Sequence, residues 1–68
     1  NMYSQAPVTI KMISTTRYEI ELRSMPNDSY TIRYLNKGEF ETKVSEMFRD
    51  FNTAALLFDM KLQELEGN

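Results

Sequence analysis

Paired carboxylates are the residues of this sequence whose type and spacing come closest to a chemical site. Glu19 and Glu21, and again Glu39 and Glu41, stand two positions apart in segments that alternate like strands, so each pair would share one strand face. Two carboxylates act as acid and base when their surroundings separate their pKa values. Basic residues alternate with these acids and nothing indicates burial, so we interpret both pairs as part of a solvated ladder of charges.

Histidine and cysteine are both absent, which removes the commonest general base and the best nucleophile. Residues 14–16 are Ser-Thr-Thr, a turn sequence with no partner that would activate a hydroxyl. A zinc site would have to use carboxylates alone, which is rare for zinc. Lys37-Gly38 lacks the glycine spacing of a phosphate-binding loop. The sequence therefore predicts a protein that is not an enzyme and has no metal or other cofactor.

Length and composition bound the rest. Sixty-eight residues make one domain, residues 1–68, in which we expect residues 1–6 to be flexible. Asn1, which precedes Met2, is interpreted as a cloning remnant. No apolar run approaches the ~18 residues of a membrane span. Without cysteine there is no disulfide argument for secretion, so we expect a cytoplasmic protein with no membrane partner.

The elements that must position these residues begin with three alternating segments. Residues 8–13, 18–23 and 30–35 each alternate apolar with polar side chains and are rich in β-branched and aromatic types. That pattern is typical of strands with one buried face. The even-numbered positions are apolar in all three segments, so we predict that they form the core face.

Turn chemistry then sets a register. A turn centred on Thr15, the loop at residues 24–28 and a hairpin loop at residues 36–38 would place Ile10, Ile20, Ile32 and Thr42 opposite one another. Residues 39–44 become a fourth strand, with Phe40 beside Tyr34 in the core. The other face would align the charged residues of neighbouring strands in the order Lys11, Glu19, Arg33 and Glu41.

The predicted fold is α+β, a four-stranded antiparallel meander in the order 1-2-3-4 with one C-terminal helix packed on one face. An alternative stays open for residues 39–49. Phe40, Val44, Met47, Phe48 and Phe51 also fit a helical stripe, and Asn36 with Glu39 resembles a capping box. On that interpretation the sheet has three strands and a longer helix begins near Glu39.

From about Asp50 the apolar spacing becomes helical. One face carries Phe51, Ala54, Ala55, Phe58, Leu62 and Leu65. Asp50 or Asn52 would cap the start of this helix, and Gly67 would stop it.

Three apolar residues lie off that face, namely Leu56, Leu57 and Met60. Clustered apolar residues on the solvent side of a helix suggest contact with a partner. A wide apolar face, or the N-terminal segment with Met2, Tyr3 and Pro7, would also cover them. We expect self-association as a homodimer through this patch, because small domains without disulfides or metals gain burial by association.

Two functions follow from these features. The first is a non-enzymatic protein-interaction module or regulator, which acts as a homodimer and binds another protein, with Leu56, Leu57 and Met60 as the candidate protein interface. The alternative is a nucleic-acid or transcription-associated factor that uses Lys11, Arg23 and Arg33 on the outer sheet face. The net charge of −2 and the interleaved acids disfavour nucleic acid as a partner.

Overall fold

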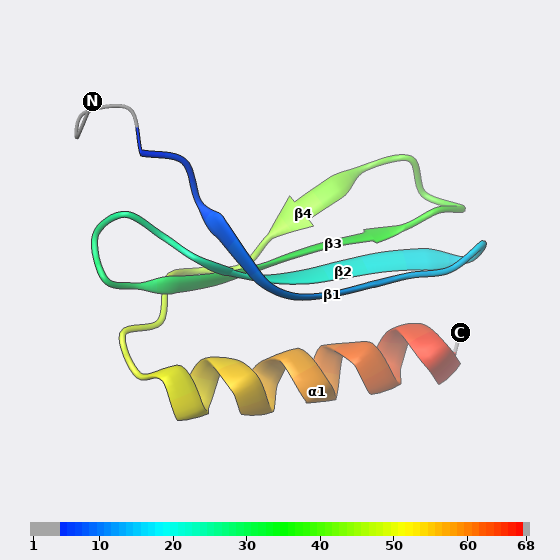
Figure 1. Cartoon of the computed structure of the whole chain (residues 1–68). Coiled ribbons are helices and arrows are strands. Elements are labelled where there is room, and N and C mark those ends of the chain that lie inside the picture. The colour runs from blue at the N-terminus through cyan, green and yellow to red at the C-terminus, as the bar shows by residue number, and fades with distance from the viewer. Residues whose placement is uncertain (1–4, 68) are drawn as a thin grey trace.

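The computed structural model describes residues 5–67, and its architecture is the predicted one. Four strands, β1 (Val8–Ser14), β2 (Tyr18–Ser24), β3 (Tyr30–Asn36) and β4 (Thr42–Val44), form one antiparallel sheet in the order β1-β2-β3-β4. Helix α1 (Phe51–Gly67) lies across one face of this sheet (Figure 1). Residues 39–49 contain a short strand and no helix, so the three-stranded alternative is wrong.

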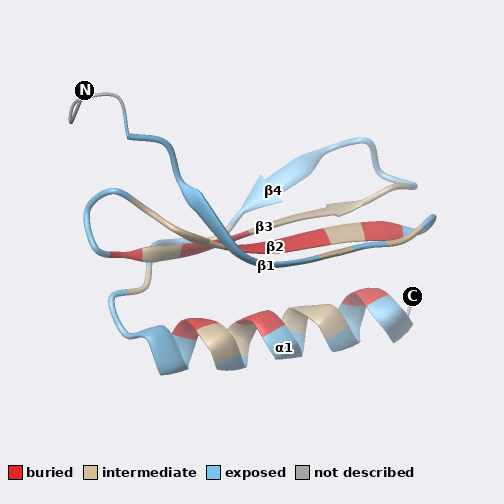
Figure 2. Cartoon of the chain, in the orientation of Figure 1, coloured by how far each residue is buried: buried red, intermediate tan, exposed pale blue. Residues whose placement is uncertain are grey.

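The core lies between α1 and the two central strands. Its buried apolar side chains are Tyr18, Ile20, Leu22, Ile32, Ala54, Phe58 and Leu65. Figure 2 shows that the buried residues follow β2 and the upper side of α1, whereas β1 and β4 are exposed. The helix therefore lies over β2 and β3, in the middle of the sheet, and leaves the inner side of β4 open.

The start of α1 is capped as the sequence indicates. The Asp50 carboxylate accepts hydrogen bonds of 2.8 Å from both the backbone N–H and the hydroxyl of Thr53. These two hydrogen bonds lower the pKa of the Asp50 carboxyl. Asp50 thereby fixes where the chain leaves the loop and enters the helix.

The predicted register of β1 is wrong, and a β-bulge is the reason. The pairing shifts between Thr9 and Lys11, so that Ile10 is left over and Lys11 lies opposite Leu22. Beyond the bulge the odd-numbered residues face the helix, and Ile13 lies opposite Ile20. Ile10 and Met12 were expected in the core and are instead 43% and 46% exposed.

Strands β2 and β3 keep the predicted faces but pair two residues away from the predicted register. Ile20 lies opposite Tyr34, and Leu22 lies opposite Ile32. The loop between these strands is closed by a hydrogen bond of 2.8 Å from the Met25 backbone N–H to the Ser29 carbonyl, with Asp28 in the left-handed region at φ 59°. A shift of two residues leaves the same side chains in the core, so the predicted core of β2 and β3 holds.

The fourth strand is shorter than predicted and its faces are reversed. Residues 39–41 belong to a longer loop, in which Phe40 has a φ of 63° and is 92% exposed. Val44 lies opposite Arg33 on the outer face, and Lys43 lies opposite Tyr34 on the helix side. The predicted core position of Phe40, and the place of Glu41 in the charge ladder, are therefore both wrong.

Beyond β4 the chain continues along β3. The Ser45 backbone N–H donates to the Ile32 carbonyl at 2.9 Å, and Tyr30 and Phe48 exchange two backbone hydrogen bonds of 2.8 Å. This segment, residues 45–48, brings the chain to the start of α1 and forms the side of the groove described below.

Two further sequence predictions concern the ends of the chain and membranes. Of residues 1–6, only Gln5 and Ala6 lie within the described residues, where both are exposed and outside regular structure. Between residues 5 and 67, no helix is long and apolar enough to cross a membrane.

Candidate protein interface

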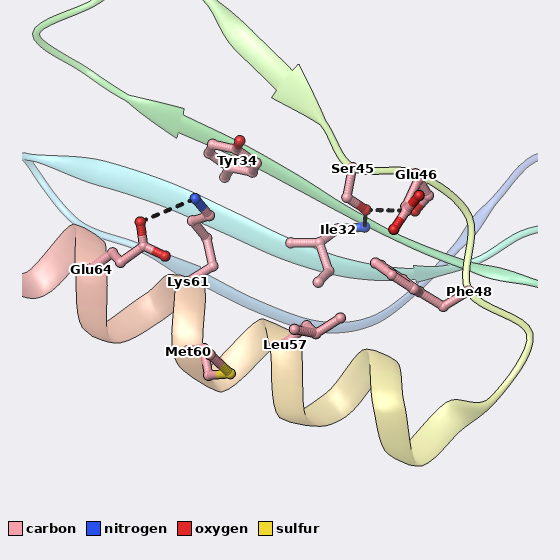
Figure 3. Close-up of a pocket in the computed structure, with 9 residues that line it drawn as sticks. All are labelled: Ile32, Tyr34, Ser45, Glu46, Phe48, Leu57, Met60, Lys61 and Glu64. Carbon is pink, nitrogen blue, oxygen red and sulfur yellow. Dashed lines mark hydrogen bonds and ion pairs between the residues drawn. The ribbon is translucent and has the colours of Figure 1, made fainter.

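A groove runs between α1 and the 45–48 segment, with β3 as its floor (Figure 3). Ile32 and Tyr34 of β3 form the floor, and the helix side carries Leu57 and Met60. The remaining lining residues are Ser45, Glu46, Phe48, Lys61 and Glu64. The groove has a volume of about 310 Å³ and is open to solvent. It exists because one helix is too narrow to cover the inner face of four strands.

Two of the three charged side chains that line the groove, Lys61 and Glu64, are paired with each other. Lys61 Nζ lies 4.6 Å from the centroid of the Tyr34 ring and 3.3 Å from Glu64 Oε1. Both contacts hold the lysine along the helix at one end of the groove, where its charge faces an aromatic ring and a carboxylate. The rest of the lining is mostly apolar, so the groove is suited to an apolar side chain with polar neighbours.

The three residues predicted as an interface lie along this side of α1. Leu56 is 61% exposed and Met60 is 52% exposed, while Leu57 is half-buried at the edge of the core. The apolar face of the helix is therefore wide enough for the core to cover part of Leu57. Pro7 is exposed, and Met2 and Tyr3 lie outside the described residues. Leu57 and Met60 line the groove, and Leu56 extends the apolar surface around the helix.

Sequence reasoning missed the other side of the groove. Phe48 and Ser45 line it because residues 45–48 continue along β3, and no alternating pattern marks that segment. Phe48 was noticed only as part of a possible helical stripe. Its pairing with Tyr30 depends on the observed β3–β4 register, which accompanies a loop over residues 37–41 that is longer than predicted.

The outer face of the sheet carries a partly buried ion-pair network. Arg33 Nε lies 2.8 Å from Glu21 Oε1, and Arg33 Nη2 lies 3.1 Å from Glu19 Oε2. The Thr9 hydroxyl also donates a hydrogen bond to Glu21. The predicted ladder is thus right in pairing Glu19 with Arg33, and Glu21 is a further member that the predicted register left out. The expectation that these carboxylates are solvated is wrong for Glu21, which is 7% exposed.

Burial and pairing act in opposite directions on this carboxylate. Burial alone would raise the pKa of the Glu21 carboxyl, but the hydrogen bonds from Thr9 and Arg33 and the charges of Arg33 and Arg23 lower it overall. The same pairing with Glu21 raises the pKa of the Arg33 guanidinium. Both groups are therefore held in their charged forms, which is the state of a structural ion pair.

The three cations proposed for nucleic-acid binding do not share a face. Lys11 lies on the helix side of the sheet, 3.9 Å from Asp59 Oδ1 and 5.1 Å from the Phe58 ring centroid, because the bulge reverses β1. Arg23 and Arg33 lie on the outer face, where Arg33 is engaged by two glutamates. The Arg23 Nε is buried and has no hydrogen-bond partner within residues 5–67.

Metal ligation and similarity to known proteins give no further information about this site. Among the described residues no group of three or more acidic side chains is placed to hold a metal ion. Comparisons with known protein families, curated proteins and solved structures found no match to this chain.

Proposed function

We propose that this protein is a non-enzymatic protein-interaction module that acts as a homodimer through the groove beside α1. The observation that carries the proposal is the surface formed by Leu56, Leu57 and Met60 next to an open groove whose floor is apolar. Burying such a surface against a second copy removes apolar area from water, which is the main driving force of association.

The outer sheet face supports the non-enzymatic part of the proposal. Glu19 and Glu21 are both engaged by Arg33, and the carboxyl of Glu21 has a lowered pKa, the opposite of what a general acid requires. A cytoplasmic location belongs to the same proposal and rests on a composition without cysteine.

The edge of β1 is the competing surface for self-association. It is seven residues long and exposes Val8, Ile10 and Met12. However, the bulge at Ile10 interrupts the regular spacing of its free backbone groups, a device that protects sheet edges from pairing. The groove has no comparable obstruction, so we assign self-association to the groove.

Single glutamate substitutions test this assignment. Leu56→Glu and Met60→Glu place a charge on the proposed contact, and we expect each variant to shift from dimer to monomer in size-exclusion chromatography with light scattering. Phe40→Glu is the matched control, because Phe40 is 92% exposed in the β3–β4 loop and is not among the residues that line the groove. A dimer that survives both helix substitutions, or one that Phe40→Glu disrupts, would contradict the assignment.

A further inference from the structure

A set of side chains along α1 and just before it can be paired with its own copy when the helix is turned end for end. This stripe consists of Arg49, Thr53, Leu56, Leu57, Met60 and Glu64. At about 100° per residue, the helical members of this stripe fall within a sector of about 100°. All of them are exposed except Leu57, which is half-buried at the groove. The helical members of the stripe therefore form a continuous surface along the side of α1 that faces the groove, and Arg49 stands two residues before the first residue of the helix.

We infer that the two copies pack with their α1 helices antiparallel, about a two-fold axis between Leu56 and Leu57. This inference rests on the proposed homodimer and adds its geometry. When the helix is turned end for end about that point, Leu56 meets Leu57 and Thr53 meets Met60, and the N-terminal end that carries Arg49 comes to the part of the partner helix that carries Glu64. The contacts are then reciprocal, because each position of one copy meets the same partner position in both directions, as a two-fold interface requires.

Charge favours this orientation over a parallel one. Arg49 stands beside the helix N-terminus, where the helix dipole is positive, and no ion pair of Arg49 is found within residues 5–67. The Glu64 side chain is 66% exposed, and its one ion pair among the described residues is made through Oε1 with Lys61. Antiparallel helices bring these opposite charges together. Parallel helices would place Arg49 beside Arg49 and Glu64 beside Glu64.

Cysteine cross-linking tests the orientation, because the sequence contains no cysteine of its own. A ¹⁵N-labelled Thr53→Cys variant is mixed with unlabelled Met60→Cys under mild oxidation, and mass spectrometry distinguishes the mixed disulfide from the two homotypic ones. We expect the mixed disulfide to dominate. In the antiparallel pair, position 53 of one copy lies about seven residues, or roughly 10 Å, along the axis from position 53 of the other, which is beyond disulfide reach.

The outcomes separate this inference from the proposed homodimer. Dominant homotypic disulfides would show parallel helices, and an absence of disulfides in a protein that remains dimeric would place the contact elsewhere; either result overturns the inference alone. A wild-type chain that is monomeric at high concentration overturns both. Circular dichroism of each variant confirms that its fold is retained.

A charge exchange gives a second, independent test. Arg49→Glu and Glu64→Arg should each weaken dimerisation by roughly tenfold, since each places two pairs of like charges in contact. The double variant should recover most of that loss. Glu66→Arg is the control, because Glu66 lies on the opposite side of the helix. If the losses of dimer affinity in the two single variants simply add in the double variant, the antiparallel contact is overturned.

Discussion

Glu21 is a carboxylate at 7% exposure on the sheet face opposite the helix, and its surroundings explain how that face is stabilised. Arg33 reaches across from β3, Thr9 donates from β1, and Arg23 adds positive charge from its own strand. The outer face is therefore held by a hydrogen-bonded ion pair that joins three strands. Such a pair stabilises the fold only while the carboxylate is ionised.

Stability should therefore depend on pH through Glu21. Its folded pKa is lowered from the usual 4.5, so its contribution is present above about pH 4.5 and is lost as the pH falls through the folded pKa. Glu21→Gln should lower the free energy of unfolding by about 1–3 kcal/mol at pH 7, and by less in acid. Urea unfolding of the wild type and of the variant, at pH 7 and again in acid, measures this difference. Glu41→Gln, in the exposed β3–β4 loop, is the control; an equal effect of both substitutions would contradict the structural role of Glu21.

At the scale of the elements, the bulge in β1 decides which apolar side chains are in the core. Ile20 in β2 is fully buried in the core cluster that also contains Phe58, whereas Ile10 at the bulge remains 43% exposed. Both residues stand at even positions of alternating strands and were predicted to face each other. The structure separates them, because Ile13 takes the position opposite Ile20.

The same substitution at both sites tests this difference. Ile20→Val should lower the free energy of unfolding by about 0.5–1.5 kcal/mol, since it removes a methylene from a packed core. Ile10→Val should change it by less than about 0.5 kcal/mol, as surface substitutions usually do. Chemical denaturation at low protein concentration measures both. Equal losses of unfolding free energy at the two positions would show that Ile10 is buried in the core and would contradict the bulge.

The sequence was sufficient for the elements and their order, but not for their register. Alternation fixes which side of a strand is apolar, so the faces of β2 and β3 were predicted correctly even though their pairing is shifted by two residues. A bulge at Ile10 and a left-handed backbone at Phe40 leave no compositional signal, because both positions hold ordinary apolar residues instead of glycine. Because of the bulge and the left-handed residue, Lys11 and Phe40 do not lie on the faces predicted for them.

For the candidate site, sequence periodicity was enough to single out Leu56, Leu57 and Met60, since they stand off the main stripe of the helix. Periodicity could not predict the groove beside these three residues. That groove depends on the lateral position of α1 over β2 and β3 and on the path of residues 45–48, and both are set by tertiary packing. The separation of Lys11 from Arg23 and Arg33 likewise followed only from the register.

At the scale of the whole molecule, one helix of 17 residues covers the two central strands of the sheet and leaves a groove at its side. A second copy would complete the inner layer with its own helix, giving each sheet the cover that a single chain does not provide. A standard interface buries about 800 Å² on each partner. The accessible surface of the chain is 4748 Å², so such an interface would occupy roughly one-sixth of it.

Sedimentation equilibrium of the wild-type protein, from roughly 10 µM to roughly 1 mM, tests self-association without any substitution or label. We expect the apparent mass to rise from the 8.0 kDa of one chain toward twice that value as the concentration increases. A mass that stays at 8.0 kDa across the whole range would contradict the homodimer, and with it the function that we assign to the groove beside α1.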